Sequence, residues 1–378
     1  MGPLQLKPRR VPFCTNSSNN VTLLHPGYPD GQNILFFLPM LDSGGIHHET
    51  VWVACALLAN SRWDGFLSVT RDGEEIPEPK QDTLQGERYY FRVPGDPQWA
   101  VIPSIKNLRC PSTVPGLWAS CPIEPATTDD VGKRDQTCRI TTSLIPNEIA
   151  HIIPQAQIEW WQSNSMFTYT ANPDFSSDTR CAENAILLRR DLHKMWDDHR
   201  FAIVPKRDKW VVHVLWKSPS KELETEYHNL ELQPLYGVAR QFLLCRFALA
   251  ILSKSMFLKQ GTERKLVTLD AEGEVQVRSM SPNEYSRRFF PTGRANSRSG
   301  SPTKRQRPDR DMNGTDVDKT EMGRMDGMES STESEEQRGR PRKRRGSFDT
   351  PSFDPLSEPP FKHICLAHTP PRSISPAY

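Results

Sequence analysis

The sequence predicts an α+β fold that ends in a disordered tail, and three observations lead to this prediction. Short runs rich in β-branched and aromatic residues, such as Ile149–Ile153, are typical of strands. Longer stretches, such as Ala185–Trp196, place apolar residues at the spacing of an amphipathic helix. From about Arg288 onward Ser, Arg, Pro, Gly and Asp dominate, so this segment cannot bury enough apolar surface to offset the entropy of ordering it.

The composition limits the classes of protein to which the chain can belong. The chain has 378 residues, room for two domains, and a net charge of only +2, so attraction to nucleic acid must come from local patches. Its eight cysteines form no C-x-x-C pair, and we expect small buried thiols in a reducing, intracellular compartment. Neither a signal peptide nor a run approaching the length of a membrane span is visible, so we expect no membrane partner. A P-loop, a G-x-G-x-x-G motif and a G-x-S-x-G motif are missing, which argues against a nucleotide cofactor and a serine hydrolase.

Changes in composition divide the chain into five expected segments. These are a loose leader, an amino-terminal α+β region of unknown role, a unit that carries the candidate site, a weak hairpin or connector, and the tail. Their expected bounds are 1–30, 31–126, 127–255, 256–287 and 288–378. The polar, turn-forming stretch Ala126–Gln136 marks the boundary before the candidate-site unit.

In the amino-terminal region the apolar runs predict strands at Asn33–Met40, Phe66–Thr70 and Arg88–Val93, and a helix at Glu49–Ala59. The proline-rich residues 94–126 are expected to form an extended connector. His47, His48 and Glu49 lack the H-E-x-x-H spacing of a zinc site. We therefore expect a hydrogen-bonded histidine pair at a helix start.

In the middle of the chain the strand Ile149–Ile153 contains His151 and is closed by Pro154, which has no N–H to give to a ladder. Residues Cys138–Thr142 and Glu148–Ile153 can pair as a hairpin that presents this histidine. An insert follows, with a short helix whose Trp160 and Trp161 we expect to pack rather than stack on bases.

Asn184 stands in the loop before the expected helix Ala185–Trp196, where an asparagine caps free N–H groups. Two strands (Phe201–Val204 and Trp210–Leu215), a core helix (Tyr236–Lys254) and a weak hairpin (264–278) complete the ordered part. His213 alternates within an apolar strand, so we expect a hydrogen-bonded structural histidine there.

Three residues carry the candidate site: His151 on a strand, Asn184 at a loop-to-helix junction, and His193 inside the helix. This ordered set resembles the HNH endonuclease family in the variant A-H-I-x-P … N-x-x-x-L-x-x-D-L-H-x-x-F-D, and the chain is similar to fungal proteins that carry it behind a separate amino-terminal region. The matching positions are Ala150–Pro154, Asn184, Leu188, Asp191–His193, Trp196 and Asp197. The resemblance covers about the middle third of the chain, and residues 30–120 and 205–250 more loosely.

The resemblance implies a ββα-metal unit, with His151 as general base, His193 as metal ligand, and Asn184 orienting the histidine or binding the ion. Asp197 shares a helix face with His193 and can hold that imidazole or coordinate through water. Many family members carry Asp, Glu or His immediately before the general base, whereas this chain has Ala150. Glu148 can compensate only through a bulge or loop, because on a strand it points to the opposite face from His151.

The implied function is a metal-dependent endonuclease that uses one divalent ion (Mg²⁺, Mn²⁺ or Zn²⁺) on nucleic acid, with DNA favoured over RNA. The alternative is a catalytically inactive HNH-fold protein of the nucleus that binds DNA or other proteins. The tail bears on both, because its basic cluster resembles an AT-hook and also satisfies a nuclear import signal. A merely solvated charge cluster remains open. The cluster comprises Arg338, Arg340, Arg342, Lys343, Arg344 and Arg345.

Overall fold

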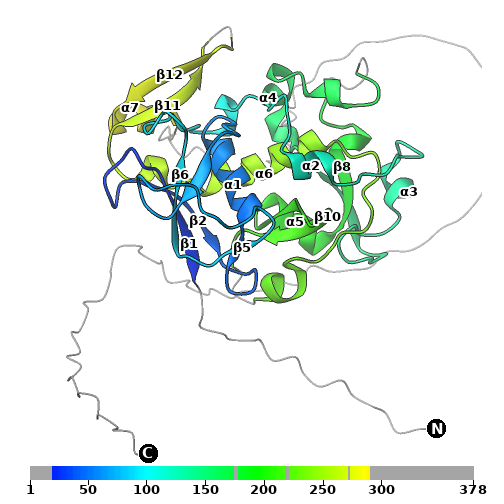
Figure 1. Cartoon of the computed structure of the whole chain (residues 1–378). Coiled ribbons are helices and arrows are strands. Elements are labelled where there is room, and N and C mark those ends of the chain that lie inside the picture. Colours follow the sequence, from blue (N-terminus) through cyan, green and yellow to red (C-terminus); the bar gives the residue numbers. More distant parts are fainter. Residues whose placement is uncertain (1–18, 174–177, 218–220, 271–272, 290–378) are drawn as a thin grey trace, which may run out of the picture. The chain divides into compact units, whose positions relative to one another are not determined.

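The computed structural model of the protein describes residues 19–173, 178–217, 221–270 and 273–289 (Figure 1). Helices and strands are mixed within this part, so the predicted α+β class is confirmed. The expected disordered tail, with its basic cluster Arg338–Arg345, lies outside the described residues. Divisions of the chain at residues 126 and 255 stay predictions.

A four-stranded sheet in the order β2-β1-β6-β4 forms the amino-terminal part. Its strand β1 (Asn20–Leu24) pairs antiparallel with β2 (Ile34–Pro39) and parallel with β6 (Arg88–Arg92), and β4 (Phe66–Ser68) continues beyond β6. The expected loose leader is therefore wrong for β1, which lies inside the sheet. Its apolar alternation, missed in the sequence, buries Val21 and Leu23 completely.

Backbone groups at the start of β2 have hydrogen-bond partners outside the sheet. Gln260 accepts a hydrogen bond from the N–H of Ile34 (3.0 Å) and donates one to its carbonyl (2.6 Å). The N–H of Met256 donates to the carbonyl of Leu35 (2.8 Å). The segment after α6 thus occupies three polar backbone groups at the start of β2.

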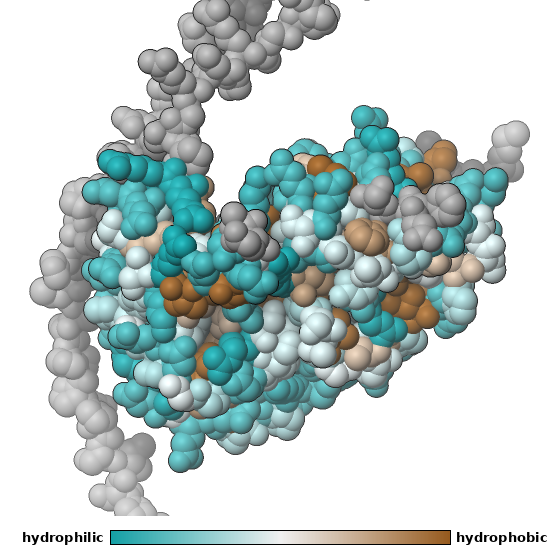
Figure 2. All heavy atoms as spheres, turned by 90° about the horizontal axis from the view of Figure 1, so that it is seen from above, coloured by the Kyte–Doolittle hydropathy of each residue, from teal (hydrophilic) through white to brown (hydrophobic). Residues whose placement is uncertain are grey.

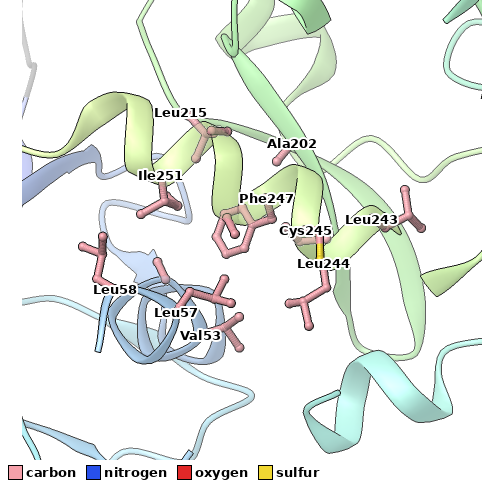
Figure 3. Packing of buried hydrophobic residues seen from close by; sticks show 14 of the residues in the cluster. Val53, Leu57, Leu58, Ala202, Leu215, Leu243, Leu244, Cys245, Phe247 and Ile251 are labelled. Atoms are coloured by element: carbon pink, nitrogen blue, oxygen red, sulfur yellow. The ribbon is translucent and has the colours of Figure 1, made fainter. Parts of the chain in front are cut away.

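Two helices form the centre of the hydrophobic core. Helix α1 (His48–Leu58) is buried along its whole length, as its nearly continuous apolar sequence requires, and α6 (Arg240–Lys254) packs against it. Figure 3 shows Phe247 and Ile251 of α6 directed toward α1. The core continues without a break from Val21 to Tyr285.

The segment Arg240–Lys259 is long and apolar enough to cross a membrane by composition, contrary to the expectation that no run approaches this length. However, 67% of that window is buried inside the protein. Burial of this kind is typical of a core helix, so the segment is weak evidence for a span.

Two further hairpins flank this core. Strand β9 (Phe201–Lys206) pairs with β10 (Lys209–Val214), and β11 (Arg264–Leu269) pairs with β12 (Val275–Met280). The first was predicted as two strands from its apolar runs, and the second as a weak hairpin at residues 264–278. The shorter elements are β3 (Ile46–His47), β5 (Thr83–Leu84), α2 (Gly116–Ser120), α3 (Val131–Asp135), α4 (Ile158–Ser163), α7 (Pro282–Phe289) and single turns at Ile105–Asn107, Gln155–Gln157, Met166–Tyr169, Leu223–Tyr227 and Phe257–Lys259.

The remaining elements correct two sequence predictions. Strand β7 (Asn147–His151) pairs with β8 (Ala185–Arg189), not with Cys138–Thr142, which forms a turn. The expected helix Ala185–Trp196 is half wrong, because β8 takes its first residues and α5 covers only Arg190–Asp197. Four consecutive buried residues, Ala185–Leu188, suit a strand enclosed on both faces.

The face of the protein in Figure 2 is mostly hydrophilic, with apolar residues in small separate patches. Exposed large apolar side chains include Leu144 (71%) and Ile145 (82%), which lie just before β7.

Candidate functional site

The candidate site is built on β7, β8 and α5. β7 and β8 run antiparallel in unbroken register, with His151 opposite Ala185, and α5 begins directly after β8. Helix α5 buries Leu192 and Trp196, and the indole Nε1 of Trp196 donates to the carbonyl of His151 (3.0 Å). This bond ties the end of β7 to the helix, so two strands and one helix form a single ββα unit.

His151 lies at the end of β7 and is only partly buried. Its Nε2 is 3.5 Å from the amide nitrogen of Gln155, a long contact that holds the imidazole only weakly. Burial lowers the pKa of His151, and the nearby His193 lowers it further, while Asp178 and Asp197 act in the opposite direction. The imidazole is therefore neutral near pH 7 and can accept a proton.

His193 on α5 sits between two carboxylates. Its Nδ1 is 3.0 Å from Oε2 of Glu148, and its Nε2 is 3.5 Å from Oδ2 of Asp197. Arg190 Nε lies 3.2 Å from the other oxygen of Glu148. The structure thus brings Glu148, His193 and Asp197 together on the surface.

Glu148 reaches His193 without a bulge. It shares with Ala150 the strand face that α5 covers, as alternation along a strand requires. Glu148 therefore needs no bulge or loop to contact His193. Helix α5 crosses that face and carries His193 to the carboxylate.

Asn184 does not join this group. It is completely buried in the single turn Ala182–Asn184. Its Oδ1 accepts from the N–H of Ile153 (2.8 Å), and its Nδ2 donates to the carbonyls of Ile153 (2.9 Å) and Thr179 (2.8 Å). An amide used in this way positions the chain just after His151, and it has no contact with the exterior where an ion would bind. The expected roles as helix cap and ion ligand do not fit this position.

The side chains at the surface fit a divalent cation by their chemistry. Carboxylate oxygens suit Mg²⁺ and Mn²⁺, and imidazole together with carboxylate suits Zn²⁺. The carboxylates of Glu148 and Asp197 each contact a different nitrogen of His193, so a bound ion would take the place of one of these contacts.

A tighter set of metal-ligand side chains lies elsewhere. One ligand atom from each of Asp42, His213 and His228 lies within 4.8 Å of the other two. This set could not be predicted from the sequence, because no local spacing joins the three residues. The expectation for His47 and His48 is confirmed: Nδ1 of His47 caps α1 at Thr50, and Nδ1 of His48 contacts the carbonyl of Glu78.

The ββα unit lies within a segment that matches a known protein family. Residues 138–204, from the turn before β7 into β9, match the model of the HNH endonuclease family. This segment is an HNH endonuclease domain. No curated protein and no solved structure matches the chain. The HNH domain contains His151, Asn184, His193 and Glu148, and it implies nucleic acid as the partner.

Proposed function

We propose that the HNH domain hydrolyses phosphodiester bonds of nucleic acid, with DNA favoured over RNA and with His151 as the general base. One observation supports this most strongly: a single ββα unit carries a partly exposed imidazole at the end of β7 and, on α5, an imidazole held between two carboxylates. A neutral histidine can take the proton of an attacking water near pH 7.

The chain's own residues divide the work as follows. Trp196 binds the carbonyl of His151, and Asn184 binds the backbone of Ile153 two residues later, so the end of β7 keeps one position while the imidazole accepts the proton. His193, Glu148 and Asp197 would hold one divalent ion (Mg²⁺, Mn²⁺ or Zn²⁺). Such an ion, when bound, neutralises charge on the phosphate and assists the departing oxygen.

The test is plasmid nicking by the full chain with Mg²⁺ or Mn²⁺, with and without EDTA. Wild type should nick and EDTA should stop it, while His151→Ala should reduce the rate by about 100-fold or more, since general-base catalysis contributes about 10²–10⁴-fold. Gln162→Ala, an exposed position on α4, is the matched control and should keep the wild-type rate. Equal nicking by His151→Ala would remove the assignment of the base.

A second candidate is an HNH-fold protein that binds DNA in the nucleus without cutting it. Ala150, in the place where many family members carry a ligand, favours this candidate, as does the basic cluster Arg338–Arg345. It predicts salt-sensitive binding that is lost when the arginines of this cluster are replaced by glutamine, with no nicking in any metal. A fluorescent fusion with and without those replacements tests the nuclear location.

A further inference from the structure

The set Asp42, His213 and His228 brings together three distant parts of the chain. Asp42 precedes β3, His213 lies on β10, and His228 follows the turn Leu223–Tyr227. Nε2 of His228 is 3.2 Å from Oδ1 of Asp42, and the rings of His213 and His228 are 5.1 Å apart. None of the three belongs to the HNH domain at residues 138–204.

The unusual member is His213, which is completely buried. Both of its ring nitrogens lack a hydrogen-bond partner among the described residues, and so does Nε2 of the neighbouring His47. The expectation of a hydrogen-bonded structural histidine at His213 is therefore wrong. Buried polar atoms without a partner are costly and rare, and a bound ion or water is a common reason for them.

We propose that Asp42, His213 and His228 form a second metal site, which takes a divalent transition cation of the zinc type. Two imidazoles and one carboxylate match the ligand preference of Zn²⁺ and its neighbours, whereas Ca²⁺ and Mg²⁺ prefer oxygen ligands alone. Burial keeps the pKa of both histidines below its ordinary value, so they are neutral, as metal ligands must be.

The carboxylate is already oriented for this role. Lys206 and Asn229 donate to Oδ1 of Asp42 (2.7 and 2.8 Å), and the N–H of His47 donates to its Oδ2 (2.9 Å). Hydrogen bonds of this kind around a ligand are typical of metal centres, where they fix the direction of the ligand.

Binding of a metal at His228 requires one rearrangement of its ring proton. The N–H of Val214 donates to its Nδ1 (3.2 Å), which places the ring proton on Nε2, facing Asp42. A metal at Nε2 moves this proton to Nδ1 and displaces that single long hydrogen bond. The ammonium of Lys206 is the competitor, because it already neutralises the same carboxylate.

Asp42 connects the set to a cavity, which neither His213 nor His228 lines. This cavity of about 390 Å³ has Asp42, His47 and Asn229 in its wall. When bound, the ion would join the amino-terminal turn before β3 to the β9–β10 hairpin and to the segment that follows it. The site is therefore expected to stabilise the fold without depending on nuclease activity.

The test uses the full chain in a His193→Ala background, which removes the ligand proposed for the HNH ion. Co²⁺ should bind with one equivalent and give visible absorption bands, and Zn²⁺ should raise the melting temperature. His213→Gln and His228→Gln should each weaken this binding at least 10-fold. His25→Gln, which changes a buried histidine whose hydrogen-bond partners are Trp99 and Gly27 and not the set, should bind like the parent.

Three results would overturn the proposal. The first is the absence of a bound equivalent, and the second is equal binding by the parent and His213→Gln. The third is binding that appears only in Lys206→Met, which would identify the lysine as the natural cation of this cluster. Should the histidine variants fail to fold, X-ray absorption of the zinc-loaded parent decides: two imidazoles in the zinc shell support the site, and a shell without imidazole refutes it.

Discussion

The buried amide of Asn184 leads to the sharpest stability prediction. Asn184→Ala removes three side-chain hydrogen bonds of 2.8–2.9 Å and leaves the N–H and carbonyl of Ile153 and the carbonyl of Thr179 without a partner. Each buried group left unpaired costs about 1–3 kcal/mol, and single substitutions rarely cost more than about 5 kcal/mol, so the free energy of unfolding should fall by about 3–5 kcal/mol.

Urea unfolding followed by tryptophan fluorescence measures this loss, with Asn147→Ala as the matched control. Asn147 also donates to two carbonyls, those of Ser143 (2.7 Å) and Leu144 (3.0 Å), but it is partly exposed and water can replace it. The control should lose no more than about 1 kcal/mol. If both variants unfold at the same urea concentration while only Asn184→Ala loses metal-dependent nicking, Asn184 acts as a ligand and the structural role is refuted.

Three further predictions concern pH and packing. The lowered pKa of His151 places the acid limb of the nicking rate below pH 6.5, because the neutral form is required; a limb at or above 6.5 would exclude His151 as the base. Burial, aided by Arg200, lowers the pKa of Lys254 from 10.5 to about 7. Between pH 7 and 10.5 the unfolded chain therefore binds more protons at Lys254 than the folded chain does. The free energy of unfolding should accordingly rise with pH across this range. Lys254→Met should lose this rise in pH-dependent unfolding, and an unchanged rise would place its origin elsewhere. Trp161→Ala should lower the free energy of unfolding by about 3–5 kcal/mol, since the ring is completely buried against Phe242; a loss of nucleic-acid binding with unchanged stability would instead support base stacking.

The elements that could be predicted are those whose pattern of apolar residues fits only one type of secondary structure. The strands of the β9–β10 hairpin and helices α1 and α6 have the expected type, because their apolar runs have a length typical of only one element. Strand β8 was missed because four apolar residues followed by a polar helix fit a single longer helix equally well. The pairing of β7 with β8 was also missed, since the insert separates the two strands along the chain.

In the candidate site, too, the contacts within one element could be predicted and the contacts between elements could not. His193 and Asp197 follow from helix spacing, and the structure places them together. The contact of Glu148 with His193 depends on how α5 crosses the strands, and the environment of Asn184 depends on tertiary burial. The set around Asp42 depends wholly on folding, because β10 and the segment before β3 meet only in the assembled core.

The hydrogen bonds of Gln260 and Met256 to the edge of β2 affect how the molecule behaves in solution. A strand at the end of a sheet offers its unpaired amides and carbonyls to any other extended chain, which is a common route to aggregation. Gln260 and Met256 occupy those groups at Ile34 and Leu35. A polypeptide cut at residue 255 would lose this guard, and we expect it to self-associate through β2 at concentrations where the intact chain stays monodisperse.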